Sequence, residues 1–277
     1  MPLRLLGGLH YLVLAGRATW EAVPEALRGE AAFLRRFVAE QGVQTNEVQR
    51  SWILAPLFLR VAERTGADVL DLVELGPSAG LNLVWDRYAH RYEAGSWGPR
   101  DANLELRGEE RRPVPGALLE RSVAVGRRTG IDRSPVDVTT DEGARLLTCF
   151  VWADQTERIE RLRLAIEAVR RDPPELVRGD LVDALPGVLA RRRRDGALTV
   201  VFQTAVLGYL AAGRRERVRE ILRDAGADGP LAFVSAGNPR TGQHRWGLRI
   251  ITWPGGERDF VGHADYHGAW LEWGSPV

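Results

Sequence analysis

Apolar and polar positions follow two alternating patterns along the chain. Short runs of Val, Leu, Ile and Phe predict strands at 68–75, 122–126, 175–180, 198–202 and 231–234. Apolar residues at helical spacing predict helices at 3–14, 30–41, 52–62, 141–170 and 214–225. Strands that alternate with helices are typical of a mostly parallel sheet with helices on both faces. We therefore expect a three-layer, Rossmann-like α/β fold with additional helices at the N-terminus.

The same pattern suggests how the chain is divided. Residues 1–65 read as a helical N-terminal segment and 66–277 as the α/β domain. Two short strands around the turn at 95–99 predict a hairpin inserted at about 88–110. Apolar runs on both sides of Pro254-Gly255-Gly256 predict an antiparallel hairpin near the C-terminus.

The first predicted helix, 3–14, is strongly apolar and has no N-cap or polar lead-in. Leu5, Leu9 and Leu12 would lie on one face of it. Such a face needs a partner, supplied by an upstream element or by another subunit. We therefore expect that this helix could mediate a homo-oligomer.

Composition narrows the possible partners. The chain has 38 basic residues, all of them arginine, against 37 acidic ones, which gives a net charge of +1. The absence of lysine excludes a lysine nucleophile or Schiff base, and the balanced charge argues against a nucleic-acid or membrane partner. Cys149 is the only cysteine, so no internal disulfide forms. There is no signal peptide and no apolar run of about 20 residues, so we expect a cytoplasmic protein. Because the balanced charge does not favour a nucleic acid or a membrane, we expect a small-molecule substrate.

The chain is organised around the turn that follows the first predicted strand. That strand ends at Glu74, the segment Gly76-Pro77-Ser78-Ala79-Gly80 follows, and a helical pattern begins at Leu81. A strand, a tight glycine turn and a helix together present backbone N–H groups to a ligand at the helix N-terminus. Asn82 and Asp86, four residues apart, would share one face of that helix.

Three chemistries fit this turn. A dinucleotide fingerprint needs a third glycine, which the following helix lacks. Gly76-x-Ser78-x-Gly80 also matches the nucleophile elbow of serine hydrolases, with Ser78 as the nucleophile. However, helices rather than several strands precede it, and no His-Gly-Gly-Gly oxyanion segment exists. The third is the first motif of class I methyltransferases, in which an acid such as Glu74 ends the strand. We favour this third interpretation, and the closing antiparallel hairpin agrees with it.

Acids at the ends of later strands are candidate cofactor ligands. In this fold class, Asp132 would hold the ribose hydroxyls, with Asp137 in reserve, although either residue could simply form an Asx turn. Asp180 would accept from the adenine amino group while Leu181 packs on the ring, or Asp180 could form the turn before the next helix. Gln203 would reach the carboxyl edge of the sheet, where ligands bind.

Polar residues before the helix at 52–62 are candidate substrate ligands. Thr45 or Asn46 could be the N-cap of this helix, but a cap does not explain a run that also contains Gln44, Glu47 and Arg50. Candidates for a general base are Glu47 and three later residues: Tyr209, His263 and His267. The two histidines are four residues apart, but neighbouring glycines argue against a helix there, so no metal site is expected.

Several of these segments occur in the same order in one known family. They are Gln44-Thr45-Asn46-Glu47 with Arg50, Glu74 to Leu83, Gly130-Ile131-Asp132 with Pro135 and Asp137, and His267-Gly268 with Trp270 and Trp273. Over essentially its whole length the chain resembles domain-of-unknown-function family 2332, which is itself similar to class I S-adenosylmethionine-dependent methyltransferases. The resemblance implies this fold and S-adenosylmethionine as cofactor, whereas the family itself has no established reaction. Methyl transfer is therefore the expected activity, and the balanced charge favours a small molecule as acceptor. A serine hydrolase and a cofactor-binding module without catalysis remain the alternatives.

Overall fold

The computed structural model describes residues 2–43, 47–192, 196–237 and 245–274. The chain forms two compact units. One comprises 1–46 and 136–173, and the other comprises 47–135 and 174–277. This division differs from the boundary expected at residue 65, because the helix that follows residue 49 belongs to the α/β unit and two later helices belong to the smaller one.

The smaller unit is helical. Its elements are α1 (Pro2–Leu14), η1 (Trp20–Ala22), α2 (Val23–Gly29), α3 (Ala31–Glu40), α6 (Asp141–Thr148) and α7 (Thr156–Arg171). Helix α1 packs against α3 and α6, and its Leu9 and Leu12 are buried with Leu34. The apolar face of the first helix therefore has a partner within the chain. Leu5 and other N-terminal leucines stay partly exposed, and a homo-oligomer through this helix stays a prediction.

The larger unit is built on a nine-stranded sheet in the order β5-β12-β11-β10-β9-β8-β1-β6-β7. Its strands are β1 (Val69–Leu75), β5 (Glu109–Arg112), β6 (Ala124–Asp132), β7 (Glu175–Arg178), β8 (Leu198–Thr204), β9 (Leu231–Gly237), β10 (Arg245–Trp253), β11 (Glu257–Asp265) and β12 (Trp270–Trp273). Strands β7, β6, β1, β8 and β9 are parallel. The predicted C-terminal hairpin is confirmed as β10 and β11, which pair antiparallel.

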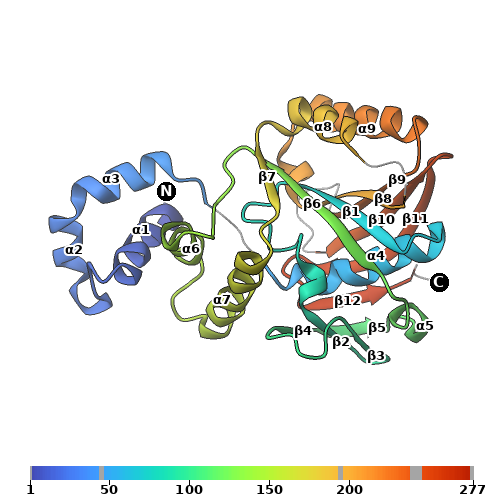
Figure 1. The fold of residues 1–277 in the computed structure, drawn as a ribbon. Coiled ribbons are helices and arrows are strands. Elements are labelled where there is room, and N and C mark those ends of the chain that lie inside the picture. The colour runs from blue at the N-terminus through green and yellow to red at the C-terminus, as the bar shows by residue number, and fades with distance from the viewer. Residues whose placement is uncertain (1, 44–46, 193–195, 238–244, 275–277) are drawn as a thin grey trace. The chain divides into compact units, whose positions relative to one another are not determined.

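Helices cover both faces of this sheet (Figure 1). Helix α4 (Arg50–Thr65) lies on one face, and α8 (Leu181–Ala190) and α9 (Ala212–Ala227) lie on the other. The predicted three-layer α/β fold is therefore confirmed. No helix in the described part of the chain is long and apolar enough to cross a membrane.

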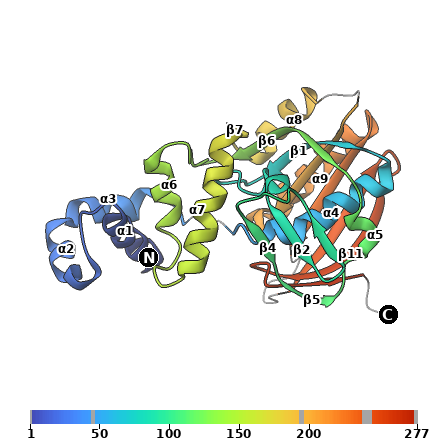
Figure 2. The same ribbon diagram turned by 60° about the horizontal axis from the view of Figure 1, so that its bottom comes forward.

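The connection from β1 to β6 contains a second, three-stranded sheet (Figure 2). It is formed by β2 (Ala89–Tyr92), β3 (Gly95–Trp97) and β4 (Glu105–Arg107), and α5 (Gly116–Leu119) follows. The sequence predicted that the strands before and after the turn at 95–99 pair as a hairpin. Instead, β2 forms a hairpin with β3, and β4 pairs parallel to β2. The phenol of Tyr92 donates to the Trp52 carbonyl (2.6 Å) and fixes this insertion to α4.

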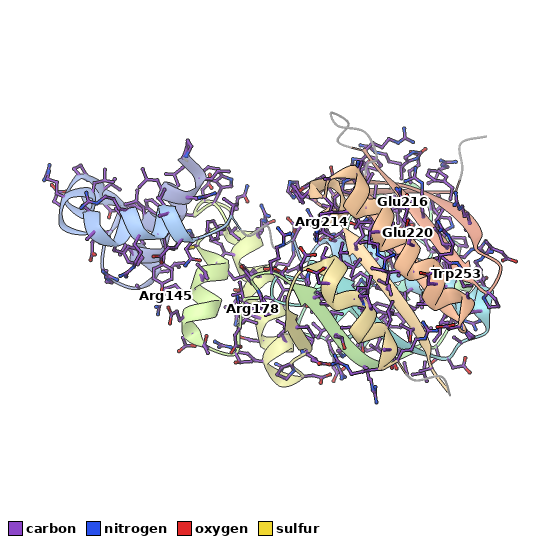
Figure 3. All side chains as sticks on the ribbon, turned by 90° about the horizontal axis from the view of Figure 1, so that it is seen from above. Arg145, Arg178, Arg214, Glu216, Glu220 and Trp253 are labelled. Carbon is purple, nitrogen blue, oxygen red and sulfur yellow. The ribbon has the colours of Figure 1, made fainter. Side chains whose placement is uncertain are left out.

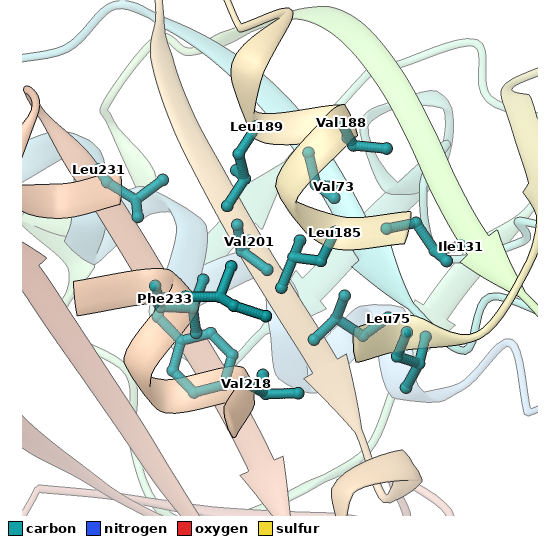
Figure 4. Close-up of a cluster of buried hydrophobic side chains, with 13 residues drawn as sticks. Val73, Leu75, Ile131, Leu185, Val188, Leu189, Val201, Val218, Leu231 and Phe233 are labelled. Atoms are coloured by element: carbon teal, nitrogen blue, oxygen red, sulfur yellow. The ribbon is translucent and has the colours of Figure 1, made fainter. Parts of the chain in front are cut away.

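The face under α8 and α9 holds the apolar core (Figure 4). Val73 and Leu75 of β1 point into it and pack with Val201, Phe233 and Leu185. Figure 3, seen from the side of α8 and α9, shows Arg214 near the start of α9 and Trp253 toward its end, where Gly226 allows close packing. On this side of the sheet, α8 and α9 pack on the apolar core.

The helix predicted after the glycine turn does not form. Residues 78–84 are turns, followed by a single 3-10 turn, η2 (Trp85–Arg87). The carbonyls that an α-helix would use accept side-chain donors instead: Leu81 from the Tyr88 hydroxyl and Leu83 from the Arg128 guanidinium, each at 2.8 Å. Apolar residues throughout the segment are also buried, so it lacks the polar face of a surface helix.

Candidate functional site

The order of the parallel strands places a switch point between β1 and β8. From β1 the chain crosses to β6 on one side and only later returns to β8 on the other. Open α/β sheets bind ligands in the crevice at the carboxyl ends of strands at such a point. Here those ends carry Glu74 and the glycine turn from β1, and Gln203 and Thr204 from β8.

The glycine turn has a backbone that its glycines make possible. Gly76 has φ 74° and Gly80 has φ 77°, in the left-handed region that favours glycine. A Cβ atom on Gly76 would lie 2.7 Å from Val206 Cγ2, so the chain also passes too close for any side chain. Ser78 adopts φ 54°, which is uncommon for a residue with a side chain.

The turn does not lie at a helix start, contrary to the expectation from sequence, and three of its N–H groups are used within the protein. The Gly76 N–H donates to the Ile131 carbonyl and the Gly80 N–H donates to the Pro77 carbonyl, both at 2.9 Å. The Ser78 N–H donates to Asp132 Oδ2 at 3.0 Å. With no helix following, close approach of the backbone is what this turn can offer a ligand.

Asp132 is the last residue of β6 and holds the turn in place. Its Oδ2 accepts from the Ser78 N–H, and its Oδ1 accepts from the Ser134 N–H at 2.8 Å, as in the Asx turn that the sequence left open for it. A carboxylate has about four acceptor positions, so it can accept further hydrogen bonds. The reserve candidate, Asp137, belongs to the smaller unit and accepts from the Thr139 N–H at 3.0 Å, as in an Asx turn.

Glu74 is a buried acid at the end of β1. It is 1% exposed, and burial is the main cause that raises its pKa from 4.5 to about 8. Its carboxyl group hydrogen-bonds the Asn82 side chain, which accepts from Ser51 Oγ at 2.8 Å. The other oxygen, Oε2, has no hydrogen-bond partner in the described structure. At neutral pH this carboxyl group is therefore mostly neutral and can donate a proton to a hydrogen bond.

Arg50 is a buried cation at the start of α4. Its guanidinium carbon lies 4.8 Å from the ring centroids of both Trp246 and Tyr266. Nε donates to the Tyr266 carbonyl at 3.1 Å, Nη1 donates to Thr204 Oγ1 at 3.4 Å, and Nη2 has no partner among the described residues. Burial is the main cause that lowers its pKa, while the nearby Glu47 and Tyr266 oppose the shift.

The start of α4 also meets the C-terminal turn at 265–269. Glu47 is 5% exposed, and its Oε2 lies 3.4 Å from Nδ1 of the exposed His267. The Tyr209 hydroxyl, another candidate, lies 3.2 Å from the Tyr266 hydroxyl. The structure therefore brings together four predicted site residues, Glu47, Arg50, Tyr209 and His267, from three distant segments.

Three other candidates, Asp180, Leu181 and Gln203, have structural roles that explain them. Asp180 caps α8 by accepting from the Val182 N–H at 2.9 Å. It also pairs with Arg133, the main cause that lowers its pKa, and with Arg214. Helix α8 thus begins at Leu181, directly after this cap.

Leu181 and Gln203 are also used within the protein. Leu181 is buried in the core under α8 and α9. Gln203 donates to Ser235 Oγ at 2.7 Å and accepts from the Leu207 N–H at 3.3 Å. Gln44, Thr45 and Asn46 lie outside the described residues.

His263 lies away from the group around Arg50. Its Nδ1 is 2.9 Å from Arg245 Nη2. Arg245 precedes Trp246, which faces Arg50, and neighbouring strand residues point to opposite faces of a sheet. His263 therefore lies on the face of the sheet opposite to Trp246, away from Arg50.

The sequence of this chain matches the family described as uncharacterized proteins conserved in bacteria, DUF2332, over residues 1–273. The chain belongs to this family. No curated protein matches it. Among solved structures it is similar to an O-methyltransferase from Bacillus cereus in complex with SAH, at 12% identity and a TM-score of 0.27, covering 83% of this chain and 71% of that one. It is also similar to an S-adenosylmethionine-dependent methyltransferase from Clostridium acetobutylicum ATCC 824, at 10% identity and a TM-score of 0.31, covering 87% and 79%.

Two residues of this DUF2332 site were missed at the sequence level. Ser51 supports Asn82, and Tyr266 covers Arg50. Each stands directly beside a residue that was singled out, Arg50 and His267 respectively. Proximity in sequence to those motifs was the only available signal.

Proposed function

We propose that this DUF2332 protein binds S-adenosylmethionine at the carboxyl ends of β1, β6 and β8 and transfers its methyl group to a small molecule. The observation that carries the proposal is the link between Asp132 and the glycine turn. Asp132, at the end of β6, accepts a hydrogen bond from the Ser78 N–H in the turn that follows β1. This link lies beside the switch point of the sheet.

The residues at this edge suit the parts of that cofactor. Asp132 keeps acceptor capacity for two ribose hydroxyls. Gly76 and Gly80 let the backbone come close to the methionine portion. Glu74, held by Asn82, supplies a neutral carboxyl group with one unused oxygen. Asp180 is less suited to accept from the adenine amino group, because two arginines and a helix N–H already use its oxygens.

Bound there, the cofactor would supply a methyl group on a positively charged sulfur, which needs little from the protein except alignment and exclusion of water. The chain would provide the alignment. Three backbone N–H groups of the glycine turn donate hydrogen bonds that fix it, two to carbonyls and one to Asp132.

The test is calorimetric titration of S-adenosylmethionine and S-adenosylhomocysteine. We expect micromolar binding to the wild type and a loss of about tenfold or more in Asp132→Ala, which corresponds to one or two charge-assisted hydrogen bonds. Asp137→Ala is the matched control and should bind as the wild type does. An absence of binding to folded wild-type protein would refute the proposal.

One observation favours a second candidate, a serine hydrolase. Ser78 has the positive φ that a nucleophile on a strained turn would adopt. However, no helix follows it directly. Among the residues that the structure describes there are four histidines, His10, His90, His263 and His267, and they contact Cys149, Trp85, Arg245 and Glu47, respectively. Labelling of the wild type by a fluorophosphonate, abolished in Ser78→Ala, would support the hydrolase; no labelling would exclude it.

A further inference from the structure

We infer that His267 is the general base of this enzyme, that Glu47 positions its ring, and that the acceptor is an aromatic compound with a phenolic hydroxyl. The inference rests on the proposed methyl transfer. It assigns the proton-accepting group and the class of acceptor.

The first observation is the geometry of the Glu47–His267 pair. Glu47 is buried, whereas the His267 side chain is 52% exposed, and the Oε2–Nδ1 distance is 3.4 Å. A carboxylate beside Nδ1 favours the tautomer in which Nδ1 carries the hydrogen, which leaves a lone pair on Nε2. The buried member thus orients the ring, and the exposed member can meet a substrate.

The second observation is that the turn carrying His267 is held on the start of α4. Arg50 Nε donates to the Tyr266 carbonyl at 3.1 Å across 216 residues of sequence. Gln49 Nε2 donates to the Gly268 carbonyl at 3.4 Å. A Cβ on Gly268, whose φ is 85°, would lie 2.6 Å from the Gln49 carbonyl oxygen, so the contact requires glycine. These contacts come from neighbouring residues on each side and keep the His267 ring beside Glu47.

The third observation concerns the aromatic rings around His267. The Tyr266 ring packs edge-on to His267, with centroids 4.8 Å apart. The Tyr209 hydroxyl is 3.2 Å from that of Tyr266, and Tyr209 is 77% exposed. An exposed aromatic side chain anchored beside a base provides a surface on which an aromatic acceptor can stack. The pKa of a phenol is about 10, so such an acceptor is protonated near neutral pH and needs a base.

The proton step follows from this arrangement. The acceptor O–H bond breaks, the proton bonds to Nε2 of His267, and the electron pair remains on the phenolic oxygen. That oxygen forms the new bond to the methyl carbon as the carbon–sulfur bond breaks, and the sulfur keeps that electron pair. The imidazolium returns its proton to water, so no oxidant or reductant is required.

The test of the pair measures the nucleophilicity of His267 without any methyl transfer. The protein is treated with diethyl pyrocarbonate, and modification of each histidine is followed by peptide mass spectrometry. We expect His267 to react faster than His263. In Glu47→Gln the reaction of His267 should slow by roughly tenfold, the low end of the range seen when the carboxylate behind a metal-ligating histidine is removed. Glu47→Asp should restore part of the rate, which a purely structural role would not produce.

The acceptor class is tested with 4-methylphenol in the presence of S-adenosylhomocysteine, using saturation-transfer NMR. We expect transfer to the phenol in the wild type and at least a halved signal in Tyr209→Ala. Methoxybenzene, which has no O–H group, should give a weaker signal than the phenol in the wild type. Equal signals from all three samples would overturn the aromatic acceptor.

The outcomes separate this inference from the proposed function. Equal reactivity of His267 in wild type and Glu47→Gln would overturn the pair even if S-adenosylmethionine binds. Conversely, His267→Asn should leave calorimetric binding of S-adenosylmethionine within about twofold of the wild type, because His267 is assigned to the acceptor. A loss of cofactor binding in that variant would overturn the assignment.

Discussion

The two faces of the sheet differ in what they bury. Under α8 and α9 a cluster of buried aliphatic and aromatic residues packs as one core (Figure 4). On the face of α4, near the carboxyl ends of β1 and β8, three buried groups are ionisable: Glu47, Arg50 and Glu74. Strand β1 serves both, because Val73 and Leu75 enter the core while Glu74, between them, points to the other face.

This difference separates stability from chemistry. Apolar burial stabilises a fold without requiring particular partners, whereas buried polar groups destabilise it unless they are hydrogen-bonded. Glu74 Oε2 and Arg50 Nη2 are both left without partners in the described structure. Buried polar atoms without a partner are candidates for binding a ligand, an ion or ordered water. Substitutions on the two faces should therefore have different consequences.

The largest effect on stability is expected from the apolar face. Phe233→Ala should lower the free energy of unfolding by about 3–5 kcal/mol, the range for truncating a buried aromatic ring. Urea unfolding followed by circular dichroism measures this. Tyr209→Ala, which removes an exposed ring, is the control and should change stability by less than about 0.5 kcal/mol. Similar losses in both variants would contradict the assignment of stability to this face.

The second effect is a pH dependence from Glu74 on the other face. Its pKa is raised to about 8 in the folded protein, so the folded state holds a proton that the unfolded state releases above its ordinary pKa. This contribution is fully present below about pH 4.5 and is lost as pH rises to about 8. The loss between pH 5 and 8 is on the order of 3 kcal/mol.

Glu74→Gln removes this titration while keeping a neutral polar side chain of the same size. The difference in unfolding free energy between wild type and variant should therefore shift with pH in that window, to the disadvantage of the wild type at high pH. Parallel stability curves for the two proteins would show that Glu74 is ionised in the fold.

A smaller effect is expected where the C-terminal turn meets α4. Gly268→Ala should cost about 1–3 kcal/mol, since it adds a Cβ at positive φ against the Gln49 carbonyl. Gly255→Ala, also at positive φ but without such a close contact, is the control for backbone strain alone. An equal loss in both variants would mean that the contact with Gln49 adds nothing.

The smallest effect is expected at Asp180, which caps α8 on the apolar face. Asp180→Ala should cost about 1 kcal/mol, the usual value of an N-cap. It should leave the calorimetric affinity for S-adenosylmethionine unchanged. A large loss of affinity instead would restore the adenine role that the sequence suggested.

Much of the fold could be predicted because its signals are local. Runs such as Leu198–Phe202 are apolar at every position, and the turn at Pro254–Gly256 marks its hairpin directly. The prediction of a helix after Gly80 was wrong, because the side chains of Tyr88 and Arg128 donate to the carbonyls of Leu81 and Leu83. Such competition depends on the three-dimensional arrangement and leaves no trace in the local pattern.

The site was predictable in its residues more than in its arrangement. Glu47, Arg50 and His267 were each singled out, but their meeting depends on contacts across more than 200 residues, such as the 216 between Arg50 and Tyr266. Conversely, His263, another candidate base, lies on the face of the sheet opposite to Trp246. The Asp180 assignment failed to anticipate Arg214, which comes from a helix 34 residues later.

The most direct test of the account is hydrogen–deuterium exchange with and without S-adenosylhomocysteine. The account predicts slower exchange in peptides covering 74–83 and 128–134, the glycine turn and the end of β6, with no change in α9. Protection confined to the α8 and α9 face, or none at saturating ligand, would contradict a cofactor site at the carboxyl ends of β1, β6 and β8.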